Sequence, residues 1–195
     1  MALISENEVR SFVPKHTQLF ESSATRLKRN SVKTFTSTDS YDVFLSHAFK
    51  DAELVEGIKL FLESKGLSVY VDWIENPELD RSKVSPGTAA VLREAMRHSK
   101  TLIYAASVHA AASQWMPWEL GFSDALHGRV AILPLAPANQ LIQAYKGQEY
   151  LGIYPYVDEV GGLLQVKSQR IAGRQLTKDQ WLVLGNNYNQ TVSVI

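Results

Sequence analysis

The chain has 195 residues, 45% of them hydrophobic, and its 20 basic and 20 acidic side chains cancel to a formal net charge of zero. This composition supports a packed core and excludes a disordered chain. The neutral balance gives no reason to expect nucleic acid or a membrane as partner. There is no cysteine, which excludes disulfides, thiolate zinc sites and thiol catalysis. No segment approaches the roughly 20 apolar residues of a membrane span, and we expect a cytoplasmic protein.

Residues 1–39 are expected to form a short helix packed on the domain, followed by a linker. Ser5 and Glu8 have the spacing of a capping box, and the apolar residues after them share one helical face. Residues 22–40 are polar, rich in serine and threonine, and contain clustered basic side chains. Such a charge cluster is typical of a solvated linker. The alternative is a nucleic-acid-binding tail, for which interleaved aromatic side chains are missing.

From Tyr41 onward the sequence alternates strand patterns with helix patterns. Near-continuous apolar strands separated by helices indicate a parallel sheet covered on both faces. We therefore expect an α/β fold with a five-stranded parallel sheet in flavodoxin-like order, flanked by helices, and the N-terminal segment outside the sheet. The expected strands are residues 41–46, 67–72, 101–106, 130–135 and 150–157, and the expected helices are residues 51–65, a helix opening at Ser85-Pro86, and residues 117–126.

Polar side chains follow the first and third expected strands. In sheets of this order, ligands bind beyond the carboxyl ends of the strands, where the strand order reverses. Ser46 and His47 end the first strand, and Ser107 follows the third, ahead of the segment that leads to Glu119. We expect these residues to line one cleft together with the loop of residues 73–84.

The common phosphate and nucleophile motifs are absent from the sequence. There is no Gly-x-Gly-x-x-Gly, Walker A or Gly-x-Ser-x-Gly pattern. The histidines show no metal-ligand spacing with carboxylates. We therefore expect no metal and no cofactor, and the remaining candidate for chemistry is an acid in an aromatic setting, Glu119.

Several segments resemble the TIR (Toll/interleukin receptor) domain. Residues 41–47, Tyr-Asp-Val-Phe-Leu-Ser-His, resemble its first signature box, and residues 67–72 with the following loop resemble its second strand and BB loop. Trp115-x-x-x-Glu119 is similar to the Trp-x-x-x-Glu motif of TIR enzymes, especially those of short bacterial proteins. The resemblance covers residues 40–158. No third box is recognisable, so residues 159–195 are expected to be an extension packed on the domain.

The resemblance implies cleavage of the nicotinamide–ribose bond of NAD+, by hydrolysis or with cyclisation, in bacterial antiphage immunity. A carboxylate beneath the ribose would stabilise the developing positive charge, and neutral nicotinamide needs no strong acid to leave. We expect Glu119 to be that carboxylate, in the first turn of its helix. The resemblance to the TIR domain also implies self-association through the BB loop and an effector that senses the product. The expected substrate-binding residues are Ser46, His47, Phe49, Trp73, Arg81, Lys83, Ser107 and Trp115.

Other interpretations of these residues stay open. Glu119 could simply complement a helix N-terminus, and Trp115 could be core. His47 could act as a base, contact the ribose, or only close a turn, while charges in the BB loop could be solvated. The whole domain could be a non-catalytic TIR adaptor, or an N-glycosidase similar to nucleoside deoxyribosyltransferases.

Overall fold

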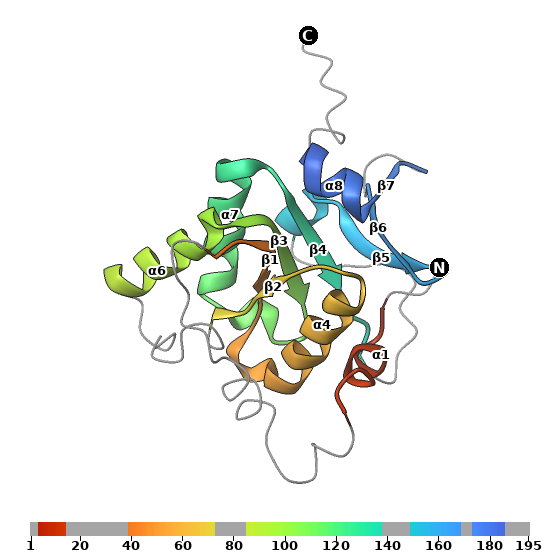
Figure 1. The fold of residues 1–195 in the computed structure, drawn as a ribbon. Coiled ribbons are helices and arrows are strands. Elements are labelled where there is room, and N and C mark those ends of the chain that lie inside the picture. Colours follow the sequence, from red (N-terminus) through yellow and green to blue (C-terminus); the bar gives the residue numbers. More distant parts are fainter. Residues whose placement is uncertain (1–3, 15–38, 73–84, 138–148, 169–172, 186–195) are drawn as a thin grey trace.

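A central sheet of seven strands organises the molecule (Figure 1). The computed structural model describes residues 4–14, 39–72, 85–137, 149–168 and 173–185. The strand order is β2-β1-β3-β4-β5-β6-β7. The strands are β1 Tyr41–Ser46, β2 Val69–Tyr70, β3 Ser99–Ala106, β4 Val130–Pro134, β5 Tyr156–Val160, β6 Leu163–Lys167 and β7 Gln175–Thr177. The α-helices are α1 Glu6–Arg10, α4 Ala52–Ser64, α6 Pro86–Arg97, α7 Trp115–His127 and α8 Lys178–Leu184, and the 3-10 helices are η1 Phe49–Asp51, η2 Ala110–Ala112 and η3 Glu149–Ile153.

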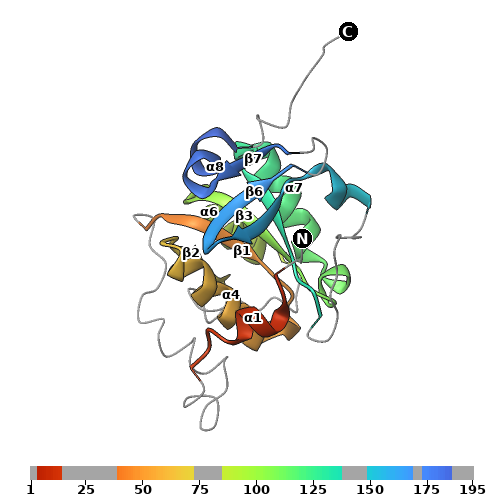
Figure 2. The same ribbon diagram turned by 90° about the vertical axis from the view of Figure 1, so that its right-hand side faces the viewer.

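The expected parallel sheet with helices on both faces is confirmed for β1 to β5, which pair in parallel in the order 2-1-3-4-5. Successive residues of a strand point to opposite faces, so the buried side chains divide into two cores. Val43 and Leu45 of β1 belong to the core beneath α1, α4 and α8, whereas Phe44 belongs to the core beneath α6 and α7. Figure 2 shows α4 and α1 together on one side of the sheet.

The sheet is larger than expected because two antiparallel strands follow β5. The expected domain limit at residue 158 falls inside β5, and residues 163–167 and 175–177 extend the sheet as β6 and β7. Gly161 and Gly162, with φ of 60° and 81°, form the two-residue connection between β5 and β6. Two consecutive positive φ angles are what a tight hairpin turn of this kind requires, and glycine adopts them without a steric penalty.

The expected strand over residues 150–157 is wrong in its position. Residues 149–153 form η3, and β5 begins only at Tyr156. Pro155 lies between the two elements and has no backbone N–H to donate to a ladder. Its carbonyl still accepts a 2.9 Å hydrogen bond from the N–H of Ile132, which aligns β5 with β4.

The N-terminal helix packs on the domain, as expected. The capping box is present, with the Ser5 hydroxyl accepting from the N–H of Glu8. As expected, the described part of this segment contributes no strand to the sheet, and Ser5 forms only an isolated parallel bridge with Ala136, outside the named strands. Ile4 and Val9 are buried in the core beneath α4. The linker expected after this helix lies outside the described residues, apart from its ends. Among the helices that the structure describes, none has the length and apolar character needed to cross a membrane.

A glycine in α4 permits the close approach of the N-terminal segment. A Cβ on Gly57 would lie 2.4 Å from the carbonyl oxygen of Val9, a distance that backbone atoms cannot tolerate. Gly121, in the middle of α7, has nothing within 4 Å of the corresponding position. Gly57 and Gly121 therefore allow a direct comparison between a helical glycine that packs against another segment and one that does not.

We expect Gly57→Ala to destabilise the protein by about 1–3 kcal/mol, because the added methyl group forces α1 away from α4. Gly121→Ala should stabilise it by about 0.5–1 kcal/mol, because alanine is the better helix former. Urea unfolding of both variants measures the difference. A similar gain in stability for both would contradict the packing of α1 on Gly57.

His127, the last residue of α7, makes stability depend on pH. Its Nδ1 accepts a 3.1 Å hydrogen bond from the N–H of Arg129. Burial, together with the positive charge of Arg129, lowers the pKa of His127 from 6.5 to about 4. The unfolded chain therefore binds a proton near pH 6.5 that the folded chain takes up only near pH 4, so folding loses stability as the pH falls through this window.

The variant His127→Asn should lack this part of the acid destabilisation, because asparagine can accept the same N–H with its side-chain oxygen but does not titrate. Urea unfolding of both proteins at pH 7 and at pH 4.5 tests it. The wild type is expected to lose more stability between the two pH values, and equal losses would show that His127 contributes nothing to the pH dependence.

Candidate functional site

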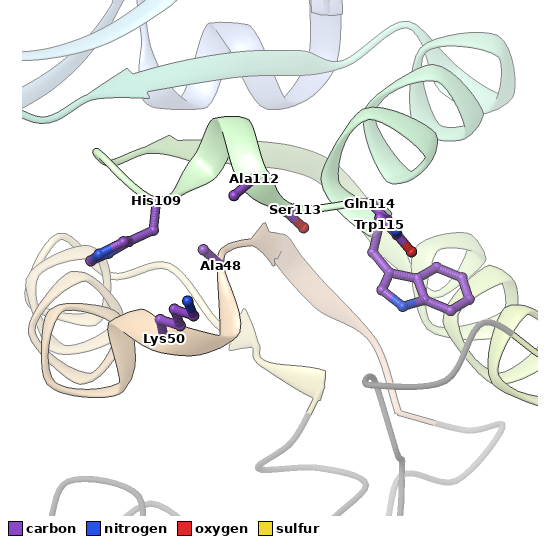
Figure 3. Close-up of a pocket in the computed structure, with 7 residues that line it drawn as sticks. All are labelled: Ala48, Lys50, His109, Ala112, Ser113, Gln114 and Trp115. Atoms are coloured by element: carbon purple, nitrogen blue, oxygen red, sulfur yellow. The ribbon is translucent and has the colours of Figure 1, made fainter.

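A pocket of about 240 Å³ lies beyond the carboxyl ends of β1 and β3. β1 has β2 on one side and β3 on the other, so this edge is the point where the strand order reverses. The described walls come from the segment after β1 and the segment between β3 and α7 (Figure 3). They consist of Ala48, Lys50, His109, Ala112, Ser113, Gln114 and Trp115.

Glu119 is joined to the end of β1 by a short hydrogen bond. The Ser46 hydroxyl donates to Glu119 Oε2 at 2.6 Å, and both residues are fully buried. Trp115, one helical turn earlier on α7, lines the pocket and packs edge to face against Trp118. The end of β1 and the Trp-x-x-x-Glu segment are therefore in direct contact, but neither Ser46 nor Glu119, expected to line one cleft, is among the described residues that line the pocket.

The helix carrying Glu119 begins earlier than the sequence suggested. We expected it to open at Pro117, but α7 begins at Trp115 and has no acidic residue in its first turn. Proline is tolerated there because the first N–H groups of a helix have no partner within it. Glu119 therefore lies in the second turn, and its carboxylate is oriented by Ser46 rather than by the helix N-terminus.

His47 is enclosed within the protein next to Ser46. It is 1% exposed, and its Nδ1 lies 2.8 Å from the carbonyl oxygen of Leu45, to which it must donate because a carbonyl only accepts. Its Nε2 faces Asp72, at 3.5 Å from Oδ1. Both ring nitrogens thus face protein groups, and His47 is not among the residues that line the pocket.

A second polar cluster joins the two segments that wall the pocket. Asp51 accepts a 2.5 Å hydrogen bond from the Ser107 hydroxyl at Oδ2, and its Oδ1 lies 2.5 Å from Nδ1 of His109. The hydroxyl of Ser107, expected to contact a ligand, is thus directed to Asp51. Sequence reasoning missed Lys50, Asp51 and His109. The available signal was their position, since each closely follows the end of β1 or β3.

The remaining predicted site residues lie where the structure gives no side-chain description. Trp73, Arg81 and Lys83 belong to residues 73–84, outside the described residues. Phe49 begins η1, but only its backbone is described. These residues stay predictions.

Comparison with known proteins identifies the family. The family model described as TIR domain matches residues 43–165. The chain is 44% identical over 162 residues to a Bacillus cereus (strain MSX-D12) protein named "Probable 3' cyclic ADP-D-ribose synthase ThsB'", covering 80% of this chain and 83% of that protein. It is 27% identical over 118 residues to a Cytobacillus dafuensis protein provisionally named cyclic ADP-D-ribose synthase TIR2, covering 60% of this chain and 31% of that protein. The β1–β3 edge, the Trp115–Glu119 turn and these matches lead to one conclusion: the chain belongs to the TIR domain family.

Proposed function

We propose that this protein cleaves the nicotinamide–ribose bond of NAD+, giving nicotinamide and either ADP-ribose or a cyclic isomer of it. The observation that carries the proposal is the 2.6 Å contact between Ser46 and Glu119, one helical turn from the Trp115 wall of the pocket. The similarity to relatives named as cyclic ADP-D-ribose synthases supports the same reaction.

The chemistry needs one carboxylate and no strong acid. As the bond from the ribose to the pyridinium nitrogen breaks, its electron pair goes to nicotinamide, which leaves neutral. Positive charge then develops on the ribose, where Glu119 would stabilise it electrostatically. Water as the nucleophile gives ADP-ribose, whereas a hydroxyl of the adenosine ribose gives a cyclic product, and either nucleophile releases one proton.

Ser46 and Trp115 have distinct roles in this proposal. The Ser46 hydroxyl holds one oxygen of the Glu119 carboxylate in place and so helps to fix the position of the charge that would stabilise the ribose. The indole of Trp115, which is largely buried but lines the pocket, offers an apolar face for the nicotinamide ring. The substrate is NAD+ itself, so no additional cofactor is required.

A second candidate function is favoured by the burial of Glu119. The residue is 0% exposed, so a substrate can meet its carboxylate only if the side chain or its cover moves on binding. A TIR domain that acts as a non-catalytic interaction module would have no such requirement. The two functions differ in whether the purified protein releases nicotinamide.

We further propose that the reaction serves bacterial antiphage defence, through depletion of NAD+ or through a product sensed by an effector. The named relatives support this setting because both come from bacteria and are named for making a small cyclic nucleotide product. Measuring NAD+ and its products in bacteria that express the protein, with and without phage infection, tests this role.

The catalytic role of Glu119 is tested by Glu119→Gln, which keeps the shape and can still accept the Ser46 hydrogen bond. We expect nicotinamide release from NAD+ to fall at least about 100-fold, the scale of losing one electrostatic stabiliser. The melting temperature should not fall, because a buried charge has been removed. Asp124→Asn is the matched control, because Asp124 lies on the same helix but accepts its hydrogen bond from the Tyr154 hydroxyl rather than from Ser46.

Unchanged activity of Glu119→Gln would remove Glu119 from the mechanism. If the wild type releases no nicotinamide, the interaction module becomes the better assignment. Base release from deoxynucleosides, measured in parallel, would favour the deoxyribosyltransferase-like alternative.

Self-association is a further expectation for this site. The described walls of the pocket come from two segments only, and the BB loop expected to complete it lies at residues 73–84, outside the described residues. We propose that a second copy of the chain completes the pocket through that loop. Activity per molecule should then rise with protein concentration, by mass action.

Specific activity measured from nanomolar to micromolar protein, beside the oligomeric state, decides this point. Charge reversal at Arg81 or Lys83 should reduce activity chiefly at the low concentrations. Full activity in a demonstrated monomer, independent of concentration, would mean that one chain builds the whole site.

A further inference from the structure

We propose that Lys50 and His109 bind the pyrophosphate of the substrate, an inference that rests on the proposed function. Both side chains line the pocket, and Figure 3 shows them on the side opposite to Trp115. The pocket thus has an aromatic end and a basic end. A dinucleotide that places its nicotinamide ring against Trp115 extends its phosphates, one ribose away, toward the basic end.

The ammonium group of Lys50 is available to a ligand. Among the lysines that the structure describes, Lys50 alone makes no ion pair, and it is exposed at the pocket. The others contact carboxylates: Lys59 with Glu63, Lys65 with Glu159, Lys100 with Asp42, Lys167 with Asp158 and Lys178 with Asp179. Lys50 is therefore the described lysine whose charge is left to attract an anion.

The acid next to Lys50 in sequence is engaged elsewhere. The side chain of Asp51 is only 8% exposed, and its two oxygens contact Ser107 and His109. A carboxylate held in this way is turned away from the neighbouring ammonium. The same contacts tie the segment after β1 to the segment after β3, so the two basic side chains are carried by walls that are fixed to one another.

Asp51 also fixes how His109 presents its ring. Because a carboxylate accepts, Nδ1 of His109 carries the hydrogen of that contact, and Nε2 is left for a ligand. The side chain is 48% exposed, so the ring edge is open to solvent at the pocket. A protonated ring donates from Nε2 to a phosphate oxygen, and Lys50 adds a point charge beside it.

The two side chains act on binding rather than on the reacting carbon. Their charge is felt equally in the substrate complex and in the transition state, so we expect changes in KM and little change in kcat. A solvated cation on a phosphate is screened by salt, which makes the effect dependent on ionic strength. Neither behaviour is expected of residues that only support the fold.

The test compares NAD+ cleavage by Lys50→Gln and His109→Asn with the wild type. Asparagine can keep an N–H directed at Asp51 while losing the second ring nitrogen. KM should rise about tenfold in Lys50→Gln, in the range of one charge-assisted contact at an open site, with kcat nearly unchanged and a weaker dependence of KM on salt. His109→Asn should show a smaller rise. The matched control is Lys100→Gln, at the opposite end of β3, which should keep the wild-type KM.

A fall in kcat with an unchanged KM, or an unchanged KM in both variants, would overturn the assignment. Titration calorimetry with ADP-ribose, which retains the pyrophosphate, separates this result from a failure of the proposed function. If the wild type binds ADP-ribose and Lys50→Gln binds it at least tenfold more weakly, the site stands even where no nicotinamide is released. No binding of ADP-ribose by the wild type, or equal binding by both proteins, overturns it.

Discussion

The parallel pairing of β1 with β3 is the constraint on which the candidate site depends. In its register Ser46 lies opposite Tyr104, so both strands end at the same edge of the sheet. The segments that follow them, far apart in the chain, then emerge side by side and wall the pocket. Three polar contacts hold these segments together: Ser46 with Glu119, Asp51 with Ser107, and Asp51 with His109. Backbone pairing supplies the position, and these side chains fix the two segments to each other.

Burying the Glu119 carboxylate costs desolvation free energy, and the packing of α7 does not require an acid at this position. Its neighbours on α7, Met116 and Leu120, belong to the core beneath that helix, and an apolar residue at position 119 would avoid the desolvation of a carboxylate. The hydrogen bond from the Ser46 hydroxyl compensates part of that penalty. A fold selected for stability alone has no use for an acid here. This imbalance between stability and chemistry is typical of functional sites, and it is the physical reason to give Glu119 a role in the reaction.

Local signals in the sequence predicted much of the fold. The helix opening at Ser85-Pro86 was predictable because serine at the N-cap and proline at N1 act within one turn, and the structure has both. Gly128, directly after α7, adopts the left-handed conformation that glycine favours at a helix end. The pair Gly161-Gly162 was an equally local hairpin signal that was overlooked, and with it β6 and β7. The contacts of Asp51 could not be predicted, because they join residues more than fifty positions apart that only the tertiary fold brings together.

The elements added to the five parallel strands serve the sheet rather than the site. β6 and β7 cover the edge that β5 would otherwise expose, and α8 buries Trp181 in the core shared with α1 and α4. An uncovered edge strand is a template for pairing with other chains, so covering β5 protects the protein against aggregation. The pocket lies at the ends of β1 and β3, and α7, on the face of the sheet opposite to α1 and α8, contributes Trp115 to its lining. The sheet separates the two cores. Substitutions that disturb α1 or α8 are therefore expected to lower stability, and to change the geometry of Glu119 only if they also distort the sheet.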